Sequence, residues 1–500
     1  MPFYFGILVT LLTLSFITRA DESSISVETT TNARVTATDH LLFSNFKDPQ
    51  DAESIPTNLF LHEDTVRGEY GILGGDLNFT NRYATTGDTS QNRIFTLEKK
   101  TISIVRDDWD LKFGDTNQEF GKGLALSLYN NSTFGINNTV EGVAANYHPD
   151  RFRMTAVGGR INVLKSPVAI NPMPNPNPLQ GRSAYLAAAS VGGDLGNATK
   201  VSGHYVGVLD QTDGSGVIER NSHTVGVTFD KSLFDEVDLY AESNMLLSTK
   251  RLGGTEAEQP TGYGSYASLV WSPSPWKAKL EVKDYRKLDL DWNRVPTLED
   301  DLIVSVHTKD VSAFRLYGER KIGQSRATVY SSYLLADDRE ERGIVNHPII
   351  GTKIPLPNHA ELESKAGYRW VPNHYYLMHV QGKGQLRTAP GQFIELSVRK
   401  QFGRTNLDKG ELYGEEDKYV AALTYTFSEK FNATLGYEYV PTNEYAQGQH
   451  FPSVGASYRT GSLVARGFVG QTSGGPQCAG GMCRQVLAFS GAMAETTITF

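Results

Sequence analysis

Strands in which apolar and polar residues alternate with a period of two restrict the fold of this chain most. In Trp276–Lys283, every second residue from Trp276 is apolar and every residue between them is charged. Because successive side chains of a strand point to opposite faces, this pattern predicts one apolar and one charged face. In a soluble sandwich the apolar face would be the inner one, whereas in a membrane barrel it would face lipid. The lengths of the turns and loops that join the strands distinguish a soluble sandwich from a membrane barrel.

Strands of this kind come in pairs joined by short polar turns, such as Asp194–Asn197, Ser272–Pro275 and Arg459–Ser462, and longer polar stretches separate the pairs. Most neighbouring turns are roughly 30 to 50 residues apart, the length of one hairpin plus one long loop. Outer-membrane barrels alternate short periplasmic turns with long external loops in this way. The sequence therefore predicts an all-β fold, a closed antiparallel transmembrane β-barrel of about 18–22 strands.

The strand count is open between Asp338 and Pro372, where Gly351–Asn358 predicts a loop and Glu361–Trp370 predicts either a strand or a loop. A β-propeller has a similar period. However, no blade signature such as Trp-Asp recurs at a fixed spacing.

Aromatic residues flank several predicted turns, as expected for the interfacial girdle of a barrel. They include Trp271 and Trp276 around one turn, Phe427 and Phe431 around another, and Phe152 after a third. Ordinary β-propensity of aromatic residues is the alternative explanation.

Residues 1–20 contain an apolar stretch, Phe3–Ile17, followed by Thr18-Arg19-Ala20, with small residues at the two positions that a signal peptidase reads. A short membrane anchor is the alternative, but about fifteen apolar residues are few for a ~30 Å hydrocarbon core. We expect a signal peptide over 1–20, an N-terminal segment over 21–56 that forms a small element or the first strand, and a β-barrel over 57–500. Beyond the signal, no run of eighteen apolar residues occurs, so a chain that stays in a membrane must close as a barrel.

The amino-acid composition excludes two classes of protein and one class of partner. With 39% hydrophobic residues, the chain is neither a helical membrane protein nor a disordered one. The formal net charge of -8 argues against nucleic acid as a partner, because binding to phosphate backbones generally needs a basic face.

The last predicted strand places Thr496, Ile498 and Phe500 on one face. This ending resembles the C-terminal signature of Gram-negative outer-membrane β-barrel proteins, a class that includes porins. The resemblance implies export to the outer membrane of a Gram-negative bacterium and recognition by the barrel-assembly machinery. A barrel there would contact outer-membrane lipid and lipopolysaccharide.

The segment Phe113–Ser127 is similar to one that recurs in an uncharacterised family of bacterial proteins predicted to be outer-membrane barrels, a resemblance that implies no activity. Gly121 and Gly123 flank Lys122, but the Gly-Lys-Ser/Thr element of a phosphate loop is missing. We expect a glycine-rich bend that starts a loop folded over or into the barrel.

Cys478 and Cys483 are the two cysteines of the chain. In an exported protein they predict a disulfide that closes a tight loop just before the last strand. The spacing is not that of a CxxC redox motif, and no histidine lies close enough in sequence for a zinc site. A redox or metal role is the alternative.

A search for catalytic patterns finds Ser222 beside His223 on a presumed strand, where the two side chains would point to opposite faces. A serine and a histidine paired across neighbouring strands, as in outer-membrane phospholipases, is the alternative. We expect no enzyme activity, no cofactor and no bound metal.

The leading functional prediction is a porin-like channel through which small polar solutes diffuse passively. Basic side chains only slightly outnumber acidic ones at the predicted inner positions, an excess too small to predict anion selectivity. One alternative is a non-conducting barrel that acts as a surface receptor, adhesin or scaffold, and the direction in which Gln118–Asn138 folds separates it from a channel. Another is a soluble secreted β protein. The candidate lumen-facing residues are Arg151, Arg153, Lys277, Lys279, Glu281, Lys283, Arg315 and Arg399.

Overall fold

The protein is described from a computed structural model. The residues that the structure describes are 33–47, 57–70, 73–86, 90–128, 130–131, 136–137, 139–162, 183–211, 219–252, 255–257, 261–288, 298, 310–323, 327–339, 343–357, 360–372, 375–405, 417–441, 449–472, 475–479, 482–486 and 489–499. Within these ranges, no helix has the length and apolar character needed to cross a membrane.

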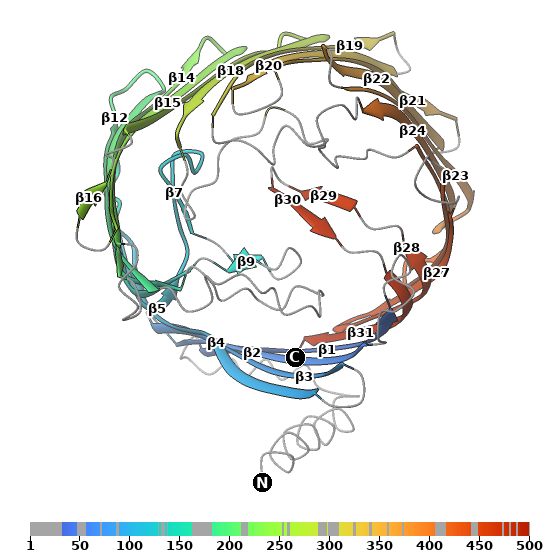
Figure 1. Ribbon diagram of the computed structural model, residues 1–500, viewed down its shortest axis with the longest axis horizontal. Coiled ribbons are helices and arrows are strands. Elements are labelled where there is room, and N and C mark those ends of the chain that lie inside the picture. Colours follow the sequence, from blue (N-terminus) through green and yellow to red (C-terminus); the bar gives the residue numbers. More distant parts are fainter. Residues whose placement is uncertain are drawn as a thin grey trace.

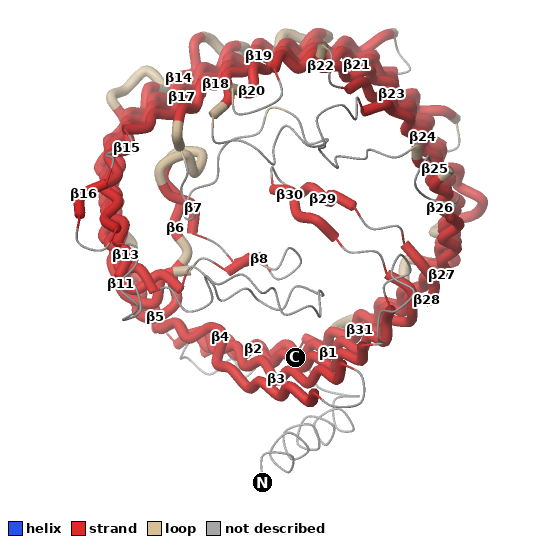
Figure 2. Tube along the Cα trace, viewed as in Figure 1, coloured by secondary structure: helices blue, strands red, loops and turns tan. Residues whose placement is uncertain are grey.

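Of the described strands, 25 form one antiparallel sheet that closes on itself as a ring, and the other six form three separate two-stranded sheets (Figures 1 and 2). The final strand, β31 (Phe489–Thr499), pairs with β28 (Leu463–Thr472) along one edge and with β1 (Ala33–Lys47) along the other. Glu495 therefore lies opposite both Arg466 and Leu42. The sheet contains 25 strands, and the three-residue β16 pairs only with β15, which leaves 24 strands in the ring itself. The predicted fold class is therefore confirmed.

The ring strands, in order, are β1 (Ala33–Lys47), β2 (Thr57–Tyr70), β3 (Leu73–Thr86), β4 (Ser90–Arg106), β5 (Trp109–Thr116), β10 (Val140–Tyr147), β11 (Phe152–Asn162), β12 (Ser183–Asp194), β13 (Thr199–Gln211), β14 (Glu219–Leu233), β15 (Val237–Leu252), β17 (Thr261–Trp271), β18 (Trp276–Arg286), β19 (Val311–Ile322), β20 (Ala327–Asp338), β21 (Gly343–Leu356), β22 (Ala360–Val371), β23 (Tyr375–Ala389), β24 (Gln392–Thr405), β25 (Lys418–Ser428), β26 (Phe431–Val440), β27 (Gln449–Thr460), β28 (Leu463–Thr472) and β31 (Phe489–Thr499). The shorter strands are β6 (Gln118–Phe120), β7 (Leu126–Leu128), β8 (Asn130–Asn131), β9 (Ile136–Asn137), β16 (Thr255–Ala257), β29 (Gly475–Ala479) and β30 (Met482–Val486).

The strand count of 24 corrects the prediction of 18–22. The missed hairpin is β21 with β22, where the stretch that predicted a loop from Gly351 is strand as far as Leu356. This stretch contains Pro355 and Pro357, and a proline cannot donate to a ladder, so its composition predicts a break in the strand. In the β21–β22 pairing, Pro355 nevertheless lies opposite Glu361, so the strand continues past its proline. The register has an earlier gap at His347 and Pro348.

The ring begins inside the N-terminal segment 21–56, because β1 starts at Ala33. The predicted signal peptide, 1–20, lies outside the described residues, as does Phe500.

The wall alternates between an exposed apolar face and a polar face. On β18, Val282 is 44% exposed, whereas Glu281 and Lys283, on either side of it, are 2% and 3% exposed. Exposed large apolar side chains continue around the outside of the ring, and they include Val227, Met245, Leu316, Leu396, Leu435 and Val454. An apolar outer surface of this kind suits contact with lipid.

The aromatic residues of the expected girdle are exposed next to the short turns. Trp271 and Trp276 flank the turn between β17 and β18, and the guanidinium of Arg320 lies 4.5 Å from the centre of the Trp276 ring. Phe427 and Phe431 pack against each other beside the turn between β25 and β26, with tilted rings whose centres are 5.2 Å apart. Phe152 is likewise exposed at the start of β11.

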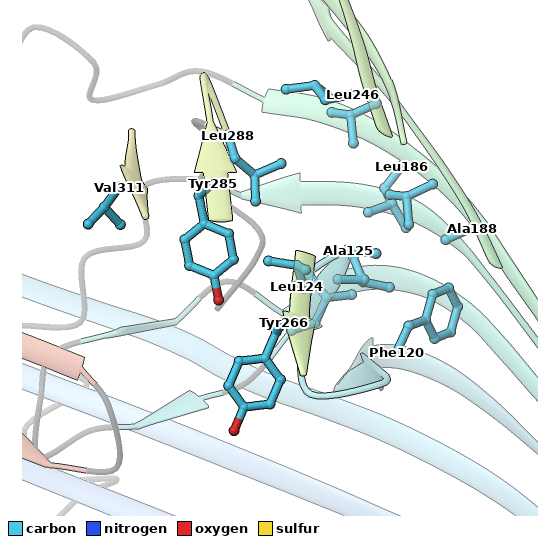
Figure 3. Packing of buried hydrophobic residues seen from close by; sticks show 14 of the residues in the cluster. Phe120, Leu124, Ala125, Leu186, Ala188, Leu246, Tyr266, Tyr285, Leu288 and Val311 are labelled. Carbon is cyan, nitrogen blue, oxygen red and sulfur yellow. The ribbon is translucent and has the colours of Figure 1, made fainter. Parts of the chain in front are cut away.

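The buried apolar core lies on the inner side of the ring, between the wall and a segment that folds into the lumen (Figure 3). We call this segment, residues 117–128 between β5 and the end of β7, the strap. Its Phe120, Leu124 and Ala125 pack near Tyr266 of β17 and Leu288, which follows β18. The core therefore belongs to one side of the barrel.

Candidate functional site in the lumen

The described part of Gln118–Asn138 folds inward (Figure 1). The strap turns sharply between β6 and β7, where the backbone N–H of Gly123 donates to the carbonyl of Phe120 at 2.9 Å. Gly121 has a φ of 60°, in the left-handed region that glycine adopts without strain. The glycine-rich bend predicted from the sequence is therefore present, and it brings the strap against the wall.

Apolar contacts fix the strap on the wall strands. Leu124 and Leu126 have no exposed surface. A Cβ atom added to Gly264 would lie 3.3 Å from Leu124 Cδ1 and 2.6 Å from Leu288 Cδ2, so β17 needs a glycine for these side chains to approach. Burial of a leucine side chain contributes about 1.5–3 kcal/mol, which makes these contacts the main attraction between strap and wall.

Polar contacts at the tip of the strap centre on Glu242 of β15, which is 2% exposed. Its Oε2 accepts hydrogen bonds from the backbone N–H of Lys122 at 2.9 Å and from the Tyr240 hydroxyl at 2.8 Å. Its Oε1 accepts one from Asn244 Nδ2 at 3.1 Å. A buried carboxylate is stable only when it is well hydrogen-bonded, so the strap helps to stabilise this one.

The Lys122 ammonium lies between two tyrosine rings. Its Nζ is 4.5 Å from the centre of the Tyr240 ring and 4.9 Å from that of Tyr266, both within the range of a cation–π interaction. Removal of water by the surrounding wall lowers the pKa of Lys122, and the positive charge of Lys279 adds to this effect, while Glu281 and Glu242 oppose it.

Glu281 forms a second polar centre beside the first. Its Oε1 accepts a 2.6 Å hydrogen bond from the Tyr266 hydroxyl and lies 2.8 Å from Lys279 Nζ. Its Oε2 lies 3.4 Å from Arg315 Nη1. The structure thus brings Lys279, Glu281 and Arg315, all candidate lumen residues, into one group.

The remaining candidate lumen residues lie apart from this group. Lys283 is buried, with its Nζ 5.4 Å from the centre of the Tyr285 ring, and Lys277 is exposed near the start of β18. Arg399 donates to Gln401 on the same strand at 3.0 Å. Arg151 and Arg153 are exposed, in the turn before β11 and at its start, respectively.

Cross-strand ion pairs mark the wall from β23 to β31. Three examples are Lys383 with Glu395 at 3.0 Å, Lys418 with Glu438 at 3.1 Å, and Arg466 with Glu495 at 3.2 Å. Because these residues alternate with exposed apolar ones such as Leu396 and Val398, they lie on the polar face. Ion pairs therefore line the wall away from the strap as well as the wall beside it, where Glu281 pairs with Lys279 and Arg315.

The sequence patterns for catalysis are not assembled in the part of the chain that the structure describes. Ser222 is 1% exposed, while His223 points the other way and its Nδ1 lies 2.8 Å from the Tyr205 hydroxyl. Across the described ranges, no three His, Cys, Asp or Glu side chains come together as metal ligands.

The two cysteines lie on the β29–β30 hairpin, which falls within the outline of the ring in Figure 1. Cys478 and Cys483 are direct partners in the antiparallel register. Their backbone positions suit the predicted disulfide, which stays a prediction because their side chains lie outside the described set.

Sequence reasoning missed the contacts of the strap and a buried histidine pair. Tyr240 and Tyr266 look like ordinary strand residues, and only the glycines around Lys122 signal a close approach of backbone to wall. His347 on β21 and His379 on β23 are buried on the two strands that flank β22, with their Nε2 atoms 2.9 Å apart. Nothing in their spacing of 32 residues indicates this contact.

Comparison with known protein families identifies the family to which the chain belongs. A family of unknown function, DUF6029, matches residues 4–167 and 398–500, more than half of the chain. The chain belongs to the DUF6029 family. The two matched segments include the strap and the strands on both sides of the ring closure, β1 and β31, and they leave out the wall strands that carry Glu242 and Tyr266. No curated protein matches the DUF6029 chain.

Solved structures share its architecture. The P pilus usher (PapC) translocation pore matches with a TM-score of 0.51 at 10% identity, over 93% of the DUF6029 chain and 99% of the usher chain. An E. coli P pilus tip assembly intermediate, PapC-PapD-PapK-PapG, also gives a TM-score of 0.51, at 11% identity, over 92% of this chain and 60% of that one. The siderophore receptor PirA from Pseudomonas aeruginosa gives 0.49 at 11% identity, over 93% and 80%. At such low identity, the likeness to the usher establishes a shared barrel fold.

Proposed function

We propose that this DUF6029 protein is a porin-like channel of the outer membrane of a Gram-negative bacterium, through which small polar solutes diffuse passively. The observation that carries the proposal is the closed ring, with apolar side chains outside and charged side chains inside. A closed ring pairs every strand edge, as a chain in lipid requires, and a charged lining favours water in the lumen. The chain would be exported by the signal at 1–20 and inserted by the barrel-assembly machinery.

The wall from β23 to β31 supports the passage of polar solutes, and the wall beside the strap determines how wide the lumen is. The wall from β23 to β31, with its ion pairs, provides a hydrated surface along which polar solutes can move. The strap covers the inner face of β13 to β18, and in Figure 1 β7 lies near that wall. The strap narrows the lumen from one side.

Paired charges predict a channel with little ion selectivity. Each cross-strand pair, such as Lys418 with Glu438, combines one positive and one negative group and leaves almost no net field. We therefore expect nearly equal permeability to K⁺ and Cl⁻. A reversal potential close to zero in a salt gradient would show this.

Planar-bilayer recording tests the channel directly. The full-length protein, extracted in detergent and shown to be folded by heat-modifiable migration on gels, should give discrete current steps. Leu124→Asp, which puts a charge into the apolar contact of the strap, should increase the noise of the open channel. Leu195→Asp, at a residue 73% exposed in a short turn, is the matched control. Folded protein without current steps would exclude the channel.

The inward strap favours a second candidate, a non-conducting barrel that acts as a surface receptor, adhesin or scaffold. In this case the strap would be part of a filled lumen, and the long loops would form the binding face. Outer-membrane recovery and heat-modifiable migration without conductance would support it. A protein found in neither the outer membrane nor a heat-modifiable form would instead be the soluble secreted β protein.

A further inference from the structure

The site around Lys122 has the composition of a receptor for an organic cation. Two aromatic rings, Tyr240 and Tyr266, lie on neighbouring wall strands, with their ring centres 6.2 Å apart. Two carboxylates, Glu242 and Glu281, accept hydrogen bonds from the hydroxyl groups of these same rings. Aromatic faces and nearby carboxylates are the groups that bind ammonium ions in proteins. We call Tyr240, Tyr266 and Glu242 the tyrosine cage.

The occupant of the cage comes from the strap and not from the wall. The Lys122 ammonium lies within 5 Å of both ring centres, at 4.5 and 4.9 Å. Lys122 is at the same time one of the few exposed residues of the strap, whereas the following residues, from Gly123 to Leu128, are buried. The cage is thus reachable from the lumen while it holds a tethered ammonium group.

The chemistry of Glu242 requires a cation or hydrogen-bond donor at this position. Glu281 lies close to Lys279 and Arg315, so its charge is compensated by the wall itself. Glu242 is 2% exposed and accepts a hydrogen bond from the backbone N–H of Lys122, while the charge of the Lys122 ammonium attracts it through space. Removal of the Lys122 side chain leaves this backbone bond in place but takes away the positive charge, and an ammonium solute at the two rings would restore that charge.

We propose that the tyrosine cage is a binding site for primary alkylammonium solutes, and that Lys122 is its resident occupant, which a solute with an amino group replaces. The space between the rings accepts an ammonium on a straight alkyl stem, as the lysine shows. This inference deepens the proposed function by naming a class of solute, and it rests on that function only for the access of solutes to the lumen.

Chemical rescue provides the test. Lys122→Ala removes the occupant, and n-propylammonium supplies the part of the lysine side chain that alanine lacks. Isothermal titration of folded, detergent-solubilised full-length protein should show n-propylammonium binding at least tenfold more tightly to Lys122→Ala than to wild type. In wild type, a tethered ammonium at an effective concentration on the order of millimolar competes for the cage. Propan-1-ol, which is neutral and has the same shape, should bind neither protein.

Paired substitutions in the cage separate the ring faces from the hydroxyl groups. In the Lys122→Ala background, Tyr240→Leu removes one ring face and should weaken n-propylammonium binding roughly two- to fivefold. Tyr240→Phe keeps the ring, loses only the hydrogen bond to Glu242, and should bind more tightly than the leucine variant. Equal binding by these two variants would overturn the assignment of the ring as the recognising group.

Three outcomes decide the proposal. Tighter binding to the alanine variant supports it. Equal binding of n-propylammonium to the two folded proteins, or equal binding of propan-1-ol and n-propylammonium, overturns it. If Lys122→Ala does not give the heat-modifiable form, Lys122→Gln keeps two of the four methylene groups and removes the charge. This variant should also bind n-propylammonium more tightly than wild type, because its neutral amide competes less for the ring faces, and equal binding would overturn the proposal. Conductance is a separate measurement, so a channel without ammonium binding, or binding without conductance, shows which of the two proposals has failed.

Discussion

The backbone N–H of Lys122 donates a 2.9 Å hydrogen bond to Oε2 of Glu242, a residue 120 positions further along the chain. This contact joins the N-terminal part of the ring to a wall strand that forms from a distant part of the sequence. It places a backbone donor of the strap on a carboxylate that is otherwise shielded from water. The position of the strap is therefore fixed by one polar contact at its tip and by the apolar side chains that follow.

Substitution of Gly121 should release the tip of the strap. A Cβ atom at this position would lie 2.6 Å from Glu242 Oε2 and 2.8 Å from Thr228 Cγ2. Gly121→Ala should therefore weaken docking by about 1–3 kcal/mol through overpacking, in addition to the strain of its positive φ. Limited proteolysis of the folded protein should show faster cleavage within residues 118–128.

Gly323→Ala is the matched control for this substitution. Gly323 has a φ of 61°, close to the 60° of Gly121, but no atom lies within 4 Å of its added Cβ. The alanine there carries the backbone strain alone. Equal protease sensitivity of the strap in the two variants would mean that the contact with Glu242 does not hold the tip.

Much of the wall can be predicted from the sequence, because each strand of a membrane barrel alternates apolar and polar residues along its own length. The alternation from Trp276 to Lys283 appears in the structure as exposed Val282 between buried Glu281 and Lys283. The short turns follow equally local rules of polar and glycine-rich composition. Fold class and most hairpins therefore need no knowledge of distant contacts.

Two features could not be predicted from local sequence: the β21–β22 hairpin and the docking of the strap on the wall. Pro348 locally breaks the ladder with β22, yet β21 continues because its other neighbour, β20, still pairs with it, with Tyr333 opposite Pro348. The strap could be recognised only as a glycine-rich bend around Lys122. Its docking depends on Glu242 and Tyr266, which lie more than one hundred residues away, and no local pattern encodes such a contact.

A charge on the outer face should be more harmful than a charge on the inner face. Val282→Arg places a guanidinium where the wall faces lipid, at a cost of about 2–4 kcal/mol near the bilayer midplane and less toward the interfaces. Ser397→Arg, between the inner residues Glu395 and Arg399, places the same group where the ion pairs lie. We expect less folded, heat-modifiable protein in the outer membrane for the first variant and a near-normal amount for the second. The reverse order would mean that the two faces of the wall are exchanged.

The β29–β30 hairpin should be closed by a disulfide. Cys478 and Cys483 are direct partners across this hairpin, and directly opposed residues have Cα separations of about 4.5–5.5 Å, within the range that a disulfide spans. Alkylation of unfolded, non-reduced protein followed by mass spectrometry should leave both cysteines unmodified, and prior reduction should make both react. Two alkylated thiols without reduction would exclude the bond.

The end of the chain should determine how efficiently the ring closes in the cell. β31 pairs with both β28 and β1, so its late incorporation completes the barrel, and Thr496, Ile498 and Phe500 form the proposed assembly signal. Phe500→Ala should lower the fraction of folded protein in the outer membrane, because a small side chain removes the terminal aromatic that the assembly machinery would read. Phe500→Tyr keeps the ring and should assemble nearly normally. Both variants should refold in detergent to the same extent as wild type, since the pairing residues of β31 are unchanged. A refolding defect of Phe500→Ala equal to its defect in the cell would show that the residue acts through barrel stability and not as a signal.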